Sequence, residues 1–304
     1  MLRTFKRRTD LKTALVVNAD DLGLTTGVND GIFDSHTRGV LTSASLFANA
    51  PATADAIHRV RLHPSLGVGG HLTLVDGRPT LPPGRVPTLV EDDGRFRASW
   101  RPFIVACLRG RVALDEVERE LTAQIDRLLS DGIQLTHLDA HKHVHAFPPI
   151  FAIVARLAKR FRIPVVRVPF ERWSPVSGGI QALERPPLLD AAMLPWVWRD
   201  YRTAAEHGLH TPQFVGRIQT GRLRAPTLES ILRGLRPGVT ELMVHPGYVD
   251  DALSHMSTRL LQSRADEVRL LCARETRELV IEAGIDLVRH DSDHSSLRSL
   301  RHAS

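Results

Sequence analysis

Short apolar runs alternate with helix-like segments along most of this 304-residue chain. An apolar run of four to eight residues is typical of a buried strand, whereas apolar residues three and four positions apart predict an amphipathic helix. The clearest helix is predicted over 114–130, and Gly132 follows it as a stop signal. Its apolar stripe consists of Leu114, Val117, Leu121, Ile125, Leu128 and Leu129. Strands that alternate with helices in this way predict a parallel α/β fold.

The remaining segments continue the alternation. Strands are predicted over 13–19, 41–49, 66–74, 133–139, 165–168, 241–245 and 285–288, and helices over 27–38, 52–62, 148–161, from 227, and over 263–283. Residues 76–100 are rich in proline and glycine and are expected to form a long ordered loop over one face, while 171–212 are ambiguous. We therefore expect a basic N-terminal extension (1–12), a single domain (13–290) and a disordered polar tail (291–304).

Polar residues suited to chemistry recur at or near the ends of the predicted strands. They are Asp20, Asp21, His71, His141 and His245, which lie far apart in the sequence. A (β/α) barrel gathers the carboxyl ends of its strands at one mouth. An irregular TIM-like (β/α) barrel is therefore favoured over an open doubly wound sheet. The absence of GxGxxG after the first strand also weighs against a dinucleotide-binding fold.

The densest cluster of such residues is HLDAHKHVH at 137–145, in which His137, Asp139, His141, His143 and His145 occupy every odd position. In an extended strand these side chains would share one face. Imidazoles and a carboxylate are ligands for a divalent metal ion. Because same-face neighbours start roughly 6.6 Å apart, we expect only one or two of them to bind the ion. The others would contact substrate or support the ligands.

Adjacent carboxylates mark the end of the first predicted strand, at Asp20 and Asp21. A buried pair is costly unless a cation or a proton intervenes, which favours one metal ligand beside one free general base. The alternative interpretation is an acidic helix cap. His71 lies in GVGGHLTL, where the glycines allow close approach of backbone or ligand. Its alternative is a core histidine bonded to a carbonyl.

Two further residues have open assignments. His245 precedes a Pro-Gly turn and is suited to protonating a leaving group, although a turn histidine that bonds locally is the alternative. Arg167 is predicted to lie on a short strand, where it would bind a substrate oxygen or the carboxylate of Glu171.

Composition narrows the classes of function. A net charge of +6 and a pI near 10 could favour nucleic acid or acidic surfaces. The arginines are scattered, however, and aromatic residues make up only 5%, so nucleic-acid binding is not expected. Cys107 and Cys272 have no CxxC partner, which argues against a disulfide framework or a cysteine zinc site. Without a signal-like stretch or a long apolar run, we expect a cytoplasmic enzyme with no transmembrane segment.

Four motifs, in this order, give the chain a family resemblance: NADDLG, GVGGHLTLVDG, THLDAHKHVHAFP and HPGYVDD. Together they resemble the signatures of the YdjC-like carbohydrate deacetylases, a group that includes chitooligosaccharide deacetylases. The resemblance covers roughly 13–290. VDGRPTLPPGRVPTLVEDDGRFR and VVRVPFE are similar to the hopanoid-biosynthesis-associated HpnK branch, although GYVDD after the late His-Pro differs from that branch.

The resemblance implies a role for each matching residue. Asp20 would be the catalytic base, and Asp21, His71 and His141 would bind one divalent metal ion. His245 matches the late His-Pro motif, and we infer from its chemistry that it acts as general acid. His143, His145 and Arg167 are candidate substrate-binding residues. The implied fold is an irregular (β/α) barrel, commonly a homodimer.

The implied reaction is metal-dependent removal of an N-acetyl group, with release of acetate. The substrate would be an N-acetylglucosamine-containing oligosaccharide or a glycolipid such as an acetylglucosaminyl hopanoid. Mg²⁺ or Zn²⁺ is the expected ion, and mixed Asp and His ligation also suits cobalt or nickel. The alternatives are an amidohydrolase or phosphoesterase type of barrel, which usually has HxH where this chain has Asp-Asp, a basic nucleic-acid-binding protein, and an inactive sugar-binding relative.

Overall fold

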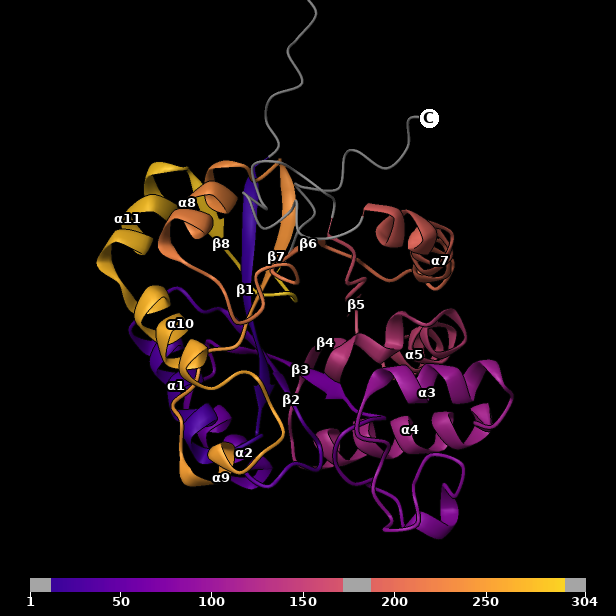
Figure 1. Cartoon of the computed structure of the whole chain (residues 1–304). Coiled ribbons are helices and arrows are strands. Elements are labelled where there is room, and N and C mark those ends of the chain that lie inside the picture. Colours follow the sequence, from indigo (N-terminus) through magenta and orange to yellow (C-terminus); the bar gives the residue numbers. More distant parts are fainter. Residues whose placement is uncertain (1–11, 172–186, 293–304) are drawn as a thin grey trace, which may run out of the picture.

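A parallel sheet lies at the centre of the computed structural model, which describes residues 12–171 and 187–292, and helices pack around it (Figure 1). Its strands are β1 (Thr13–Leu22), β2 (Ser43–Leu46), β3 (Gly67–Leu72), β4 (Leu135–Ala140), β5 (Val165–Val166), β6 (Gln213–Val215), β7 (Gly238–Val244) and β8 (Ile285–Leu287). Every strand pairing in the described residues is parallel. Apolar and small residues fill these strands because both faces of a parallel sheet are covered.

The order of the strands shows how the sheet curls. The path runs β5-β4-β3-β2-β1-β7-β6, and β8 pairs with the first residues of β1. A parallel bridge between Val165 and His210 connects β5 to the residues that lead into β6. There the Val166 N–H donates to the His210 carbonyl at 3.0 Å, and the His210 N–H donates to the Pro164 carbonyl at 2.9 Å. The two ends of the path therefore meet, and the predicted irregular (β/α) barrel is confirmed.

The helices follow the strands in the expected alternation. They are α1 (Thr26–Thr37), α2 (Thr53–Leu62), α3 (Trp100–Leu108), α4 (Leu114–Ser130), α5 (Pro148–Arg160), α7 (Pro187–Glu206), α8 (Ala225–Arg233), α9 (Asp251–Ser254), α10 (Gln262–Cys272) and α11 (Arg274–Glu282), with 3₁₀ turns η1 (Pro83–Arg85) and η2 (His141–Ala146). The predicted bounds of α4 are confirmed, and its stripe is buried except for the exposed Leu114 and the half-buried Leu129. None of the described helices is both long and apolar enough to cross a membrane.

Two sequence predictions about these elements were wrong, and one helix was missed. The single helix over 263–283 is broken at Ala273, whose ψ of 139° is extended, so α10 and α11 are separate. Residues 100–108 form α3, for which no helix was predicted. The extended histidine run ends at Ala140, because Lys142 and His143 have φ angles of 51° and 54° and turn the chain into η2. The predicted tail and N-terminal extension lie almost entirely outside the described residues, as do 172–186 of the ambiguous segment.

Candidate active site

The carboxyl ends of β1, β3 and β4 bring three of the predicted residues together. Asp21 Oδ1 lies 3.5 Å from His71 Nε2 and 3.2 Å from His141 Nδ1. One ligand atom from each residue lies within 4.8 Å of the others. A carboxylate oxygen and two imidazole nitrogens form a mixed donor set that divalent ions such as Zn²⁺ accept. The cluster can therefore hold a divalent metal ion.

His71 is oriented for such a role by its neighbours. Its Nδ1 lies 2.7 Å from Asp139 Oδ1, so the Nε2 atom faces Asp21. A carboxylate behind a histidine fixes the ring and its tautomer in many metal sites. Burial lowers the pKa of His71, but Asp139, Asp21 and Asp20 outweigh it and raise that pKa to about 10. The carboxylates around the His71 ring thus stabilise positive charge there. Phe47 packs edge-on against the His71 and His141 rings, at 4.7 and 5.3 Å between centroids.

The backbone of β1 aims two consecutive carboxylates toward the same end of the barrel. In a regular strand Asp20 and Asp21 would point to opposite faces. Here the pairing of β1 with β2 shifts register between Ala19 and Leu22, and Asp21 has a φ of 71°. Irregularities of this kind re-aim side chains beside functional sites. Both side chains are buried, each residue with 3% of its surface exposed.

Each carboxylate is held by its own buried arginine. Arg167 binds Asp20 with two donors, Nη2 to Oδ1 at 2.7 Å and Nη1 to Oδ2 at 2.9 Å. Arg264, on α10, donates from Nη2 to Asp21 Oδ2 at 2.5 Å. Burial opposes ionisation of both acids, but Arg167 and His71 lower the pKa of Asp20, and Arg264 and His141 hold the pKa of Asp21 well below its usual range. Both side chains are therefore carboxylates near neutral pH.

Arg167 also binds other acids in the barrel interior. Its Nη2 lies 2.7 Å from Asp139 Oδ2, and its Nε donates to Glu241 Oε1 at 2.8 Å. The predicted pairing with Glu171 is wrong, since Glu171 Oε2 accepts the Ile218 N–H at 3.0 Å instead. Only 1% of Arg167 is exposed. This burial argues against the predicted direct contact with substrate and makes Arg167 a support for Asp20.

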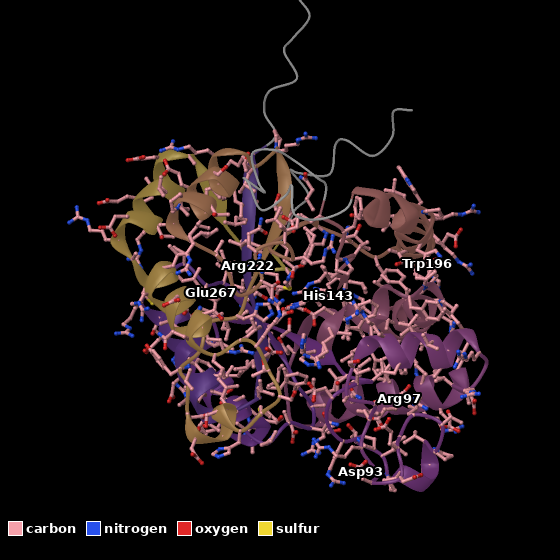
Figure 2. All side chains as sticks on the ribbon, viewed as in Figure 1. Asp93, Arg97, His143, Trp196, Arg222 and Glu267 are labelled. Atoms are coloured by element: carbon pink, nitrogen blue, oxygen red, sulfur yellow. The ribbon has the colours of Figure 1, made fainter. Side chains whose placement is uncertain are left out.

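His245 lies just after β7 and is fixed through its backbone. Its N–H donates to Glu267 Oε2 at 2.5 Å, and Glu267 comes from α10. Glu267, which Figure 2 labels, is buried. Burial lowers the pKa of His245 to about 4, so its imidazole is neutral near pH 7. Burial likewise raises the pKa of Glu267 to about 7.

The other histidines of the 137–145 run do not reach the candidate metal ligands. His145 is fully buried, with Nε2 2.9 Å from the Arg167 carbonyl. The ring of His143, which Figure 2 labels, lies 5.9 Å from that of Phe214. His137 Nε2 contacts Ser45 Oγ at 3.0 Å. Its ring occupies the space that a Cβ at Gly69 would need. Of the described histidines in the run, only His141 lies with Asp21 and His71 in this candidate metal-ligand group.

The long loop at 76–100 lies beside this group. Lys142 Nζ lies 2.7 Å from Asp76 Oδ2 and donates to the Ala98 carbonyl at 3.2 Å. Asp76 Oδ2 is also 3.7 Å from His141 Nε2. These contacts connect both ends of the loop to η2, next to a candidate ligand.

The sequence prediction missed several residues that hold the site. Asp139 was expected only in general terms, as one of the residues of the run that contact substrate or support the ligands. Glu241, Arg264, Glu267 and Ser45 were not considered. A weak signal existed for two of them: Arg264 and Glu267 are three positions apart, so they share a helix face with the buried Val268 and Leu271. Their partners lie more than twenty positions away, and no local pattern identifies them.

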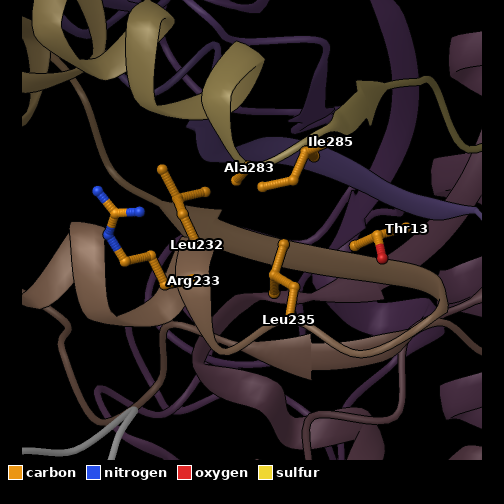
Figure 3. A pocket seen from close by; sticks show the side chains of 6 residues that line it. All are labelled: Thr13, Leu232, Arg233, Leu235, Ala283 and Ile285. Atoms are coloured by element: carbon orange, nitrogen blue, oxygen red, sulfur yellow. The ribbon is translucent and has the colours of Figure 1, made fainter.

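A separate pocket lies at the opposite ends of the strands. Figure 3 shows it between the first residue of β1, the start of β8 and the end of α8. It is lined by Thr13, Leu232, Arg233, Leu235, Ala283 and Ile285. A single charged side chain and no acid or histidine make it unsuitable for metal-assisted chemistry.

Comparison with known proteins identifies similar chains. The family model described as "YdjC-like protein" matches residues 14–282. A carbohydrate deacetylase of Brevibacillus brevis is 33% identical over 276 residues, which covers 90% of this chain and 97% of that protein. One from Geobacillus stearothermophilus is 34% identical over 279 residues, covering 90% and 95%. The crystal structure of a putative cellobiose-phosphate cleavage protein from Enterococcus faecalis superposes with a TM-score of 0.75 at 26% identity, covering 92% of this chain and 98% of the other.

Proposed function

Because this chain belongs to the YdjC-like family, we propose that it is a carbohydrate deacetylase that uses one divalent metal ion to hydrolyse the N-acetyl group of an amino sugar. The observation that carries the proposal is the group formed by Asp21, His71 and His141 next to a second, separately held carboxylate, Asp20. The relatives named carbohydrate deacetylases match over nearly their whole length, which supports a shared reaction.

Asp21, His71 and His141 would hold the ion through one oxygen and two nitrogens. A bound ion of this type polarises an amide carbonyl and makes a coordinated water more acidic. Asp139 would orient His71 for this task, and Phe47 packs against both histidine rings. Three protein ligands leave positions for water and for the substrate carbonyl.

Asp20 is the residue we assign as base. It is ionised, and Arg167 fixes both of its oxygens, so it can accept a proton from water as the water oxygen bonds to the acetyl carbon. The carbon–nitrogen bond then breaks, and the departing amine needs a proton, which we assign to His245. Because its pKa is about 4, His245 is neutral at the start, so the proton that Asp20 takes from the water would have to pass to His245 and from there to the amine. The products are acetate and a free amino sugar.

The substrate carrying the amide is proposed to be an N-acetylglucosamine-containing oligosaccharide or glycolipid. Both present the same amide, so the residues around the site must distinguish them. The loop at 76–100 is the segment we propose for this selection, because Asp76 and Ala98 contact η2 beside His141. Substrate contacts of His143 and His145, Mg²⁺ or Zn²⁺ as the ion, a homodimer and a cytoplasmic location stay predictions.

Acetate release tests the proposal directly. The protein would be stripped with a chelator, reconstituted separately with Mg²⁺, Zn²⁺, Co²⁺ or Ni²⁺, and offered a panel of N-acetylated oligosaccharides and glycolipids. We expect release only after a divalent ion is restored, and little release by Asp20→Asn under the same conditions. Absence of release from every substrate with every ion would contradict the proposed activity.

A further inference from the structure

Arg264 lies 243 positions after Asp21 in the sequence, yet its side chain contacts the Asp21 carboxylate. Its guanidinium, 2% exposed, lies 2.5 Å from Oδ2 of Asp21, one of the three candidate metal ligands. We propose that Arg264 is a positioning residue that restricts Asp21 to a single metal-binding oxygen and weakens the binding of the ion in exchange for faster turnover. This inference rests on the metal site proposed above.

The two oxygens of Asp21 face different groups. Oδ1 lies near His71 and His141, at 3.5 and 3.2 Å, whereas Oδ2 is bound by Arg264. A carboxylate can bind a metal through one oxygen or through both. With Oδ2 occupied, Asp21 can offer the ion only Oδ1. The position that a second oxygen would fill stays available to water or substrate.

The packing around Arg264 holds it in this place. Its Nε donates to the Leu260 carbonyl at 3.1 Å. A Cβ at Gly247 would lie 3.2 Å from Arg264 Cδ, and a Cβ at Gly31 would lie 2.4 Å from Gly247 Cα, closer than real contacts allow. The glycines therefore let α1, the loop after β7 and α10 approach closely. Arg264 is fixed before any ligand arrives, as a positioning group must be.

Electrostatics gives the expected direction of the effect. A guanidinium on the far oxygen of a ligand carboxylate repels a divalent cation and shares the negative charge of Asp21. Its removal would leave Asp21 with its full charge for the ion and with freedom to bind through both oxygens. We expect tighter metal binding together with a lower kcat, because the extra oxygen would occupy an open position. Simple structural damage would weaken binding as well as turnover.

Calorimetric titration of Zn²⁺ and Co²⁺ into metal-free protein tests the inference, with the Co²⁺ absorption spectrum as a second readout of coordination. For Arg264→Gln we expect the Kd to fall by about tenfold. The Co²⁺ spectrum should change, and kcat should fall. Arg264→Lys keeps the charge and should bind the ion within about twofold of wild type. Arg269→Gln, an exposed position on the same helix, is the matched control and should behave as wild type.

The outcomes separate this inference from the proposed function. If wild type and Arg264→Gln bind the ion equally, or the variant binds more weakly, the role of Arg264 is wrong while the metal site stands. If wild-type protein binds no divalent ion, both are wrong. If Arg264→Gln does not fold, Arg264→Lys still decides, because a Kd shifted by tenfold or more despite the retained charge would overturn the electrostatic explanation.

Discussion

Asp20 and Asp21 are adjacent in sequence and equally buried, yet they belong to different parts of the molecule. Asp20 is bound through both oxygens by Arg167, which follows β5 and also binds Asp139 and Glu241. Asp21 shares one oxygen with Arg264 of α10 and turns the other toward His71 and His141. Two consecutive aspartates of the chain therefore lie in different environments.

Under the proposed function, this difference would separate the base, Asp20, from the metal ligand, Asp21. Both oxygens of Asp20 are fixed within a buried network of charges, so it is held in place but still negatively charged. Asp21 has one oxygen that faces two imidazoles, an arrangement that can hold a cation. Neutralising either acid should stop the reaction, but for different reasons.

The largest expected effect is on activity. Asp20→Asn removes the proton acceptor and should lower kcat by about a thousandfold at saturating metal, in line with the usual contribution of a general base. Asp21→Asn should be as inactive, but partly rescued by a higher metal concentration, because it loses a ligand instead of the base. Acetate release measured across a metal titration distinguishes the two. Rescue of Asp20→Asn by metal would contradict the assignment.

The next largest effect concerns the two arginines. Arg167→Met would leave three buried carboxylates without their cation and should lower the free energy of unfolding by about 3–5 kcal/mol. Arg264→Met would leave only the Asp21 carboxylate without its cation. It should therefore lower the free energy of unfolding by clearly less than Arg167→Met does. Urea unfolding of both variants, metal-free and at one pH, measures the difference. If both variants lost the same free energy of unfolding, the three carboxylates around Arg167 would depend on their arginine no more than Asp21 depends on Arg264.

A third prediction concerns the pH dependence of stability that Glu267, on α10, causes. Burial raises the pKa of Glu267 from 4.5 to about 7, so the folded protein retains a proton that the unfolded chain has released. Stability from this group is therefore lost as the pH rises from 4.5 through 7. Glu267→Gln keeps an acceptor for the His245 N–H but cannot ionise. The free energy of unfolding of Glu267→Gln, measured relative to that of wild type, should therefore rise by about 3 kcal/mol between pH 4.5 and 8. Unfolding curves with the same pH dependence in both proteins would contradict this.

The smallest expected effect lies on the Asp20 side, at Ser45. Its hydroxyl donates to Asp139 Oδ2 at 2.7 Å and accepts from Asn18 Nδ2 at 2.8 Å. Ser45→Ala should cost about 2 kcal/mol, because buried polar partners lose a hydrogen bond. Ser43→Ala is the matched control on the same strand. Within the described residues the Ser43 hydroxyl has one side-chain hydrogen bond, to the Gly67 carbonyl, so its loss should cost about half as much. Thermal or urea unfolding compares them, and equal costs would argue against a network at Ser45.

Local patterns predicted much of this fold, as the bounds of α4 and the alternation of strands with helices demonstrate. They failed where the backbone departs from regular geometry without glycine or proline to signal it. Lys142 and His143 adopt left-handed conformations, so period-two spacing does not extend past Ala140. His141 is the histidine of the run that lies with Asp21 and His71, and its binding of an ion stays a prediction.

The arginines show the other limit of sequence reasoning. Asp20 and Arg167 are 147 positions apart, and Asp21 and Arg264 are 243 apart. Residue type and spacing identify acids and histidines at strand ends, but they do not say which cation approaches each acid. That choice depends on how β5 and α10 pack, which only the folded structure shows.

Calorimetric titration of a divalent ion into metal-free Asp20→Asn and Asp21→Asn tests most directly whether the two carboxylates differ as described. We predict that Asp20→Asn binds one ion with an affinity within a few-fold of wild type. Asp21→Asn should bind about a hundredfold more weakly or not at all. Wild-type affinity in Asp21→Asn, or loss of binding in Asp20→Asn, would contradict the division of the pair into ligand and base.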